Sequence, residues 1–218
     1  MMADLEPFFA DLQEQTADRG ASLQEQGQSS YTAEMRSLTR GLWTGAISWE
    51  QAFELGMFNI RVGLTNAWHR GMASVGLQPS DMSPDEQIKL RQIISEEINY
   101  LAPFLDAIEQ GSKANGGKLG PLMQRAAMWA NRFRDVENQA RQSAKNDPKL
   151  VWRLGPTEHC VDCANLADKV KRASSWQRAN IRPQMPELAC QGFRCQCILE
   201  PTELPLSKGP LPHLRGPH

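Results

Sequence analysis

The chain has 218 residues, and its 24 Lys and Arg side chains nearly balance 25 Asp and Glu side chains, for a formal net charge of -1. This balance argues against a protein that binds nucleic acid through its overall charge. No apolar run approaches the ~20 residues of a membrane-spanning helix, so we expect no membrane partner. Residues 1–6 lack the basic stretch of a signal peptide, so we expect neither export nor a disulfide framework.

The first half of the chain predicts helices. Residues 1–30 are rich in Gln and Glu and only weakly amphipathic, so we expect an N-terminal helical arm that ends in a break at residues 27–30. A second helix should run from Tyr31 to about Thr44. With the helices that follow, it would form a helical body over residues 31–149. Six Trp and nine Met residues suit packing between such helices.

Two further helices carry explicit start signals. Ser48 stands before Gln51 at capping-box spacing, and Ser83-Pro84-Asp85-Glu86 places Ser, Pro and Glu at the capping positions of the next helix. The predicted apolar faces recur at steps of three or four residues: Phe53, Met57, Ile60, Leu64 and Trp68, then Leu90, Ile94, Ile98, Leu101, Leu105 and Ile108. Pro103 lies inside the second of these helices and should kink it.

The last long helix should begin near Pro121, after a glycine-rich loop at residues 111–117, and end before Asp147-Pro148. Its predicted apolar face is Leu122, Ala126, Trp129, Phe133, Val136 and Ala140.

The chain changes character after Pro148. Residues 150–200 lose helical periodicity, hold all five cysteines, and have too few large apolar side chains for an independent core. We expect Trp152 to pack this module onto the helical body. We expect Trp176 to form a small core within the module. A Pro-rich tail at residues 201–218 should be extended and lack independent packing. The predicted fold is mainly α: an elongated body of four to five helices, then a small irregular zinc-knuckle-like module with short strands.

The cysteines are spaced like the ligands of a zinc ion. They read Cys160-x-x-Cys163, followed by Cys190-x4-Cys195-x-Cys197. A structural Zn²⁺ takes four such ligands in a tetrahedron, so we predict a structural zinc held by four of the five cysteines, with His159 as a sixth candidate. Cys195 and Cys197 would share one face of a short strand. The bound metal would contribute on the order of 10–16 kcal/mol to the folding of the module.

Other interpretations of the cysteines stay open. They could be free buried thiols, or a redox pair, which needs a helix N-terminus in a βαβ unit that the sequence does not predict here. A catalytic zinc would need H-x-E or H-E-x-x-H, and the sequence holds neither. His69, His213 and His218 lie far from the cysteines in sequence. We therefore expect no enzymatic activity.

A group of basic residues is the one indication of nucleic-acid binding. Arg134, Arg141 and Lys145 share a face of the last long helix, and the cysteine module adds Lys169, Lys171, Arg172, Arg178 and Arg182. They predict either a phosphate-binding surface or an ordinary solvated face. The interleaved acidic residues favour the solvated face.

Two stretches around the cysteines resemble the C-terminal signature of tailed-phage head morphogenesis proteins, the Mu F-like minor head proteins. Residues 151–163 read VWRLGPTEHCVDC, and residues 190–197 read CQGFRCQC. The resemblance covers roughly residues 30–200, and its specific part is the cysteine region. The family's usual ending is His-Pro-x-Cys-Arg-Cys; here Cys190, with a longer spacer, stands where that His would be.

The resemblance implies a non-enzymatic virion component that is assembled in the host bacterial cytoplasm. It would contact the phage portal, an adaptor or the major capsid protein, in several copies within a symmetric assembly, and act in head assembly or DNA delivery. Packaged DNA is a further candidate partner. The alternative functions are a capsid cement or decoration protein and a zinc-dependent nucleic-acid-binding protein.

Overall fold

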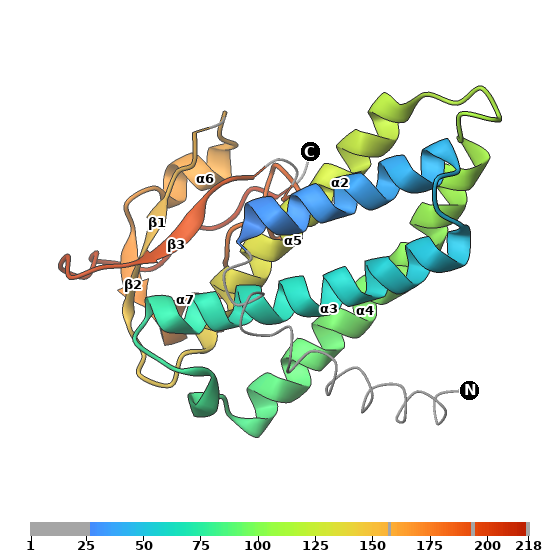
Figure 1. Ribbon diagram of the computed structural model, residues 1–218. Coiled ribbons are helices and arrows are strands. Elements are labelled where there is room, and N and C mark those ends of the chain that lie inside the picture. The colour runs from blue at the N-terminus through green and yellow to red at the C-terminus, as the bar shows by residue number, and fades with distance from the viewer. Residues whose placement is uncertain (1–26, 157, 193–194, 217–218) are drawn as a thin grey trace.

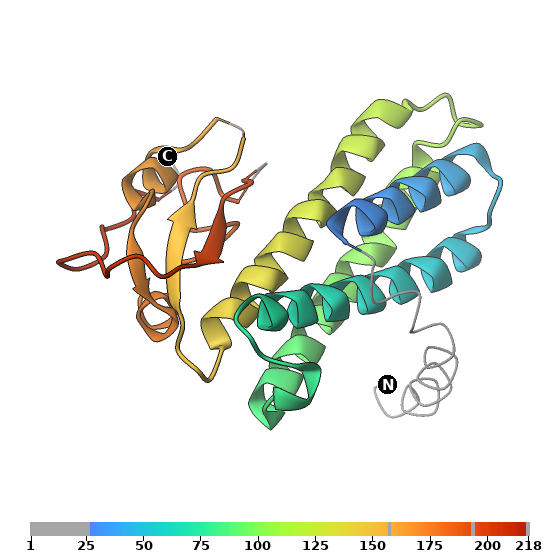
Figure 2. The ribbon, with the colours of Figure 1, turned by 60° about the vertical axis from the view of Figure 1, so that its left-hand side comes forward.

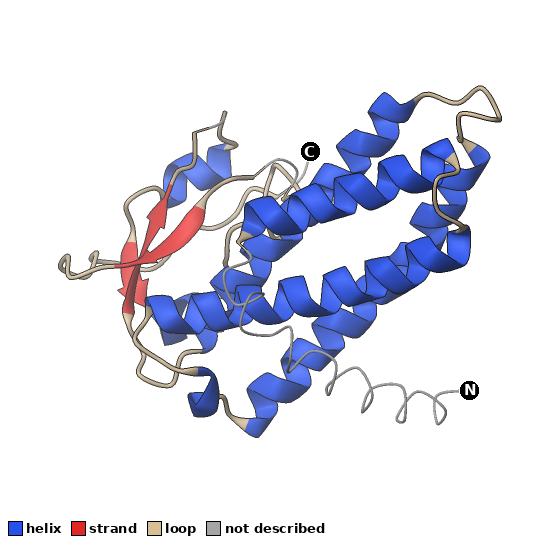
Figure 3. Ribbon diagram, in the orientation of Figure 1, coloured by secondary structure: helices blue, strands red, loops and turns tan. Residues whose placement is uncertain are grey.

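The computed structural model describes residues 27–156, 158–192 and 195–216, so most of the predicted arm at residues 1–30 lies outside the described residues. Four long helices form the body: α2 (Gln28–Thr44), α3 (Trp49–Ser74), α4 (Pro84–Gln110) and α5 (Leu119–Ser143), with a short 3-10 turn, η1 (Pro79–Asp81), after α3. Figures 1 and 3 show these helices packed together, with a small sheet beyond one end of α5. The prediction of a mainly helical fold with a small stranded module is confirmed.

The predicted start signals act as expected. Ser48 Oγ accepts a hydrogen bond from the Gln51 backbone N–H at 3.2 Å, and the Gln51 side-chain oxygen accepts one from Ser48 N at 2.9 Å. Ser83 and Glu86 make the same reciprocal pair at the start of α4. Each pair satisfies backbone donors that the first helical turn leaves without partners.

One detail differs from the expectation. α2 begins at Gln28 instead of Tyr31, with Gly27 as its N-cap, so residues 28–30 of the predicted break are helical. α4 includes Pro103, as predicted, and continues to Gln110, while the kink at Pro103 stays a prediction. No helix in the described part of the chain combines the length and the hydropathy that a membrane crossing requires.

α3 lies at the centre of the body because glycines let its neighbours approach closely. A Cβ atom on Gly63 would lie 2.3 Å from the Tyr31 ring of α2. One on Gly71 would lie 2.4 Å from the Glu137 carbonyl oxygen of α5, and Gly56 meets a side chain of α4 in the same way. Any side chain at these positions would push the helices apart.

The predicted apolar faces account for much of the core. The buried residues of these faces are Ile60, Leu64, Trp68, Leu90, Leu101, Leu105, Ile108, Ala126, Trp129, Phe133, Val136 and Ala140. The residues of these faces that are half-buried and pack against the core are Phe53, Met57, Ile94, Ile98 and Leu122. α4 also buries Ile93 and Phe104, because α2 and α3 both pack against it and widen its covered face.

The cysteine module is built on a three-stranded antiparallel sheet in the order β2-β1-β3. The chain passes through β1 (Lys149–Arg153), α6 (Val161–Leu166), β2 (Val170–Arg172), α7 (Ala173–Arg178) and β3 (Ile198–Pro201). Figure 2 shows the module against the C-terminal half of α5. α7 and β3 both contact α5, so the module and the body share one continuous apolar core.

The apolar side chains of residues 150–200 belong to the same core as those of the body, so the prediction that they lack an independent core stays a prediction. Their fully or nearly fully buried apolar residues include Leu150, Val151, Trp152, Leu166, Val170, Trp176, Ile181, Met185, Leu188 and Leu199. The central strand is covered on both faces, so three consecutive side chains are buried where an exposed sheet would bury alternate ones. Trp152 lies 5.8 Å from Trp176 between ring centroids, so both belong to this core.

The Pro-rich tail packs along the module. Ser207 N donates to the Val170 carbonyl at 3.0 Å, and Ser207 Oγ accepts from Val170 N at 3.0 Å. Leu211 and Leu214 are half-buried against the core. Pro201 ends β3, and from Thr202 to Gly216 the tail forms no helix or strand. It packs against the module by covering the open edge of β2.

Candidate metal centre

The C-x-x-C pair lies at the start of a short helix. Cys160 is the N-cap of α6, and the Cys163 backbone N–H points to Cys160 Sγ at 3.4 Å. From the sequence we expected no helix N-terminus at this pair, and that expectation is wrong. The sheet around the pair is antiparallel, and its strands do not form the βαβ unit typical of redox C-x-x-C motifs.

The second cysteine group comes from the other end of the module. Cys190 lies in the turn before Gly192, and Cys195 and Cys197 lie in the segment that leads into β3. The prediction that Cys195 and Cys197 share one face of a strand is wrong, because β3 begins at Ile198, the residue after Cys197. Both are nevertheless buried and reach the same place.

The five predicted ligands converge as two triads of thiols. The sulfurs of Cys160, Cys163 and Cys190 lie within 4.8 Å of one another, and so do those of Cys163, Cys195 and Cys197. Cys163 belongs to both triads and is the centre of the cluster. Sulfur-only donors at this spacing can hold a metal ion, and soft thiolate ligands suit zinc.

The thiols shift one another's pKa values. The pKa of Cys195 lies far below its usual value because the thiols of Cys163, Cys190 and Cys197 hydrogen-bond to its sulfur. The same contacts with Cys190, Cys195 and Cys197 raise the pKa of Cys163, since they favour its protonated form. The direction of this shift favours the thiolate form of Cys195, which is the form that binds a metal.

His159 is a weaker candidate ligand than the thiols. Its Nδ1 lies 3.9 Å from Cys197 Sγ. Among the described residues, His159 belongs to neither triad. The structure thus brings the five cysteines together and leaves His159 at the edge of the cluster.

A buried carboxylate between the first two cysteines ties the cluster to three segments. Asp162 is 1% exposed. Its carboxylate accepts hydrogen bonds from Ala189 N at 2.8 Å and from Arg215 N at 2.7 Å. It therefore joins α6, the residue before Cys190 and the C-terminal tail.

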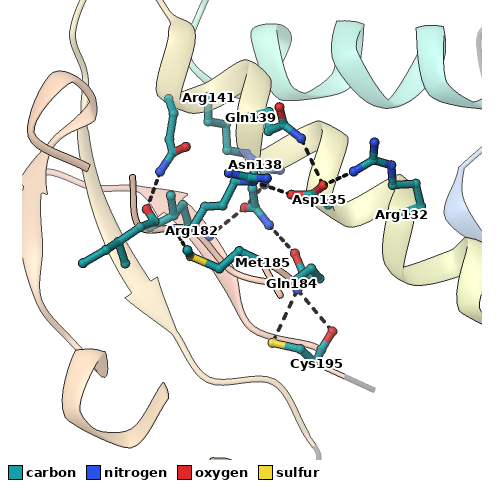
Figure 4. A network of polar contacts seen from close by, with 12 residues as sticks. Arg132, Asp135, Asn138, Gln139, Arg141, Arg182, Gln184, Met185 and Cys195 are labelled. Atoms are coloured by element: carbon teal, nitrogen blue, oxygen red, sulfur yellow. Dashed lines mark hydrogen bonds and ion pairs between the residues drawn. The ribbon is translucent and has the colours of Figure 1, made fainter. Parts of the chain in front are cut away.

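An amide pair joins the other end of the cluster to α5 (Figure 4). Gln184 Nε2 donates to the carbonyls of Cys195 at 3.1 Å and Cys197 at 2.7 Å, and lies 3.7 Å from Cys195 Sγ. Gln184 Oε1 accepts from Asn138 Nδ2 at 2.8 Å, and Asn138 Oδ1 accepts from Leu199 N at 2.8 Å. Such partners of metal ligands orient them and tune the site.

Two glycines make room for the ligand loop. A Cβ on Gly155 would lie 2.5 Å from atoms of Gln196, the residue between Cys195 and Cys197. Gly192 has φ +69°, and a Cβ there would lie 2.1 Å from the Gln184 carbonyl oxygen. The Trp152–Pro156 stretch therefore contributes a close backbone approach as well as a buried Trp.

A second polar cluster fastens the module to α5 beside the cysteines (Figure 4). Asp135, 4% exposed, accepts from Arg132 at 2.6 Å and from Arg182 of the module at 2.7 Å. Gln139 donates to the same carboxylate at 3.0 Å. The buried charge on Asp135 is thus paired on both sides.

Several residues of the predicted basic face have internal partners. Arg141 is 9% exposed and donates to Ser74 Oγ and Asn138 Oδ1, so the expectation that it lies on a solvated face is wrong. Arg134 donates to Gln28, and Lys145 pairs with Asp81. α5 passes between the body and the module, which is why its charged side chains meet partners on both.

Sequence reasoning missed Asn138, Gln184 and the structural role of Asp162. The sequence of α5 held a pattern that could have revealed Asn138: four polar side chains recur at helical spacing beside the apolar face. They are Asp135, Asn138, Gln139 and Gln142, and all four are buried. Gln184 lies in a loop and carries no comparable pattern.

Comparison of the chain with family models, with curated proteins and with solved structures found no match.

Proposed function

We propose that this chain is a non-enzymatic structural protein of a tailed-phage head, and that a zinc ion holds its C-terminal module together. The observation that carries the proposal is the convergence of all five cysteines on Cys163. The residues that surround them are those on which the resemblance to head morphogenesis proteins rests. Cys160 and Cys163 of the first of these stretches meet Cys190, Cys195 and Cys197 of the second at this cluster.

Zinc suits the donors better than other common ions. It has no geometric preference of its own and accepts four thiolates in a tetrahedron at about 2.3 Å. Calcium and magnesium take oxygen ligands instead. Binding would fix the loops that carry Cys190, Cys195 and Cys197, which have little regular structure of their own.

The groups around the cluster support a structural role over a catalytic one. Asp162 holds two backbone N–H groups, and Gln184 holds two backbone carbonyls. Both side chains therefore fix the chain around the sulfurs. A general acid or base would instead need a polar atom directed at a substrate.

The helical body would dock onto the phage portal, an adaptor or the major capsid protein, and the protein would be part of the virion. The resemblance supports these partners. The internal contacts of Arg134, Arg141 and Lys145 leave the nucleic-acid alternative with less support than a protein-binding role.

Metal analysis of the purified chain tests the zinc. We expect about one zinc per chain, bound by thiolates. A content well below half an equivalent, with all five thiols freely reactive in the native protein, would contradict it.

Quantitative mass spectrometry of purified particles tests the virion role. We expect the chain in particles from the genome that encodes it, at the low copy number of a portal-vertex component. A copy number in the hundreds would point to a cement or decoration protein. Complete absence from particles would contradict the proposed function.

A further inference from the structure

The structure divides the five thiols unequally around one centre. Cys163, Cys195 and Cys197 are all buried and form one triad. Cys160 and Cys190 are only half-buried, and each has its sulfur within 4.8 Å of Cys163 and of the other. A tetrahedral zinc that takes the buried triad needs one more ligand, so two cysteines compete for one position.

We infer that the fourth zinc ligand is interchangeable: either Cys160 or Cys190 completes the tetrahedron, and the other thiol stays free. The inference rests on the proposed function, because it takes the bound ion to be zinc. It adds that one thiol of the zinc-loaded protein is accessible to reagents and that no single loss among these two cysteines removes the metal.

Both cysteines are held in place by the same short helix. Cys160 is the N-cap of α6, where the Cys163 N–H fixes its sulfur at 3.4 Å. Cys190 follows Ala189, whose N–H is bound by Asp162 of the same helix at 2.8 Å. One rigid element thus keeps both sulfurs beside Cys163.

Cys160 and Cys190 are suited to be the fourth zinc ligand for different reasons. Cys160 forms the C-x-x-C pair with Cys163, a spacing that lets two sulfurs reach one ion. Cys190 has its sulfur within 4.8 Å of the Cys163 sulfur, the member of the buried triad that both groups share. Binding by both at once would place five thiolates on one ion, beyond the tetrahedral coordination of structural zinc.

Cysteine-to-serine variants of the full chain test the inference through zinc content. We expect about one zinc per chain in the wild type, in Cys160→Ser and in Cys190→Ser. The double variant should lose the zinc, as should Cys163→Ser, the control for a ligand shared by both triads. Loss of zinc from either single variant, or retention in the double variant, would overturn the inference.

Alkylation of the native, zinc-loaded wild type gives a second readout that does not depend on any variant folding. N-ethylmaleimide should modify one thiol per chain, and peptide mapping should find the label divided between Cys160 and Cys190. Label confined to one of the two, or on the buried triad, would overturn the inference.

These outcomes distinguish a failure of the interchangeable ligand from a failure of the proposed zinc site. If the wild type binds zinc and either Cys160→Ser or Cys190→Ser loses it, only the inference of an interchangeable ligand is overturned. A wild type without zinc overturns the zinc proposal and the inference together. His159→Ala adds a check, because retained zinc there excludes the imidazole as the fourth ligand.

Discussion

At the scale of single residues, buried amides and glycines determine where the cysteines lie. Asn138 is fully buried and accepts hydrogen bonds from Leu199 N and Arg141 while donating to Gln184. A buried polar group is stabilising only while its partners are in place, and each lost partner is costly. Asn138 therefore links the position of the ligand loop to the position of α5.

Asn138→Leu should destabilise the zinc-loaded protein by about 1–3 kcal/mol, because Leu199 N–H and the Gln184 side chain lose their buried partner. Urea unfolding measures the change. Asn99→Leu, on the exposed face of α4, is the matched control, since it makes the same substitution within a helix at an exposed side chain. Equal effects in the two variants would contradict the proposed link.

Gly192→Ala should weaken zinc binding and stability more than Gly209→Ala. Both residues have positive φ, +69° and +73°, so both variants carry a backbone cost of roughly 1 kcal/mol. Only at Gly192 would the new methyl group overlap the Gln184 carbonyl oxygen, at 2.1 Å, whereas nothing lies within 4 Å at Gly209. Competition with a zinc chelator measures the affinity. Matched affinities would show that the close approach is unimportant.

At the scale of elements, α5 is the helix that belongs to both halves of the molecule. Its apolar face packs against α2 and α3, and its polar stripe contacts α7, β3 and the loop that carries Arg182 and Gln184. The tail plays a similar part at the other side of the module, where Arg215 and the residue before Cys190 share Asp162.

Asp135→Asn should destabilise the protein by about 2–3 kcal/mol, because a nearly buried carboxylate that bonds two guanidinium groups loses its charge. Asp81→Asn is the control: its ion pair with Lys145 is solvent-exposed, and such pairs contribute about 0–1 kcal/mol. Urea unfolding of both variants tests the difference. A loss no larger at Asp135 would contradict the assigned role of this cluster.

A chain that ends at Gly209 should be less stable than one that ends at Gly216 by about 2–3 kcal/mol, since it loses two half-buried leucines and the hydrogen bond to Asp162. The two truncated chains differ only in residues 210–216. Thermal unfolding compares them directly. Identical midpoints would mean that the tail is not part of the folded module.

At the scale of the whole molecule, the body and the module share one core, and their sequences reveal it to different degrees. Helix starts are set by contacts over three residues, such as Ser48 with Gln51, and these could be predicted. The pairs that place the cysteines span longer distances, 46 residues for Asn138 with Gln184 and 53 for Asp162 with Arg215. No local pattern encodes such pairs, so the convergence on one centre could be predicted only from ligand spacing.

The consecutive burial of side chains along β1 could not be predicted, for a related physical reason. Alternating burial is expected of a strand with one exposed face, whereas β1 is covered on both sides and buries three residues in succession. A short apolar run such as Leu150-Val151-Trp152 does not by itself reveal which elements cover it. Here Trp176 of α7 provides part of the cover, with its ring centroid 5.8 Å from that of Trp152 and its Nε1 donating to the Leu150 carbonyl.

Zinc-edge X-ray absorption on the purified chain tests the central claim most directly, because it reports the number and kind of atoms bound to the ion. The account predicts four sulfur neighbours at about 2.3 Å and no nitrogen or oxygen neighbour. A first shell that includes a light atom would contradict the all-thiolate site, and a chain that holds no zinc would contradict the account as a whole.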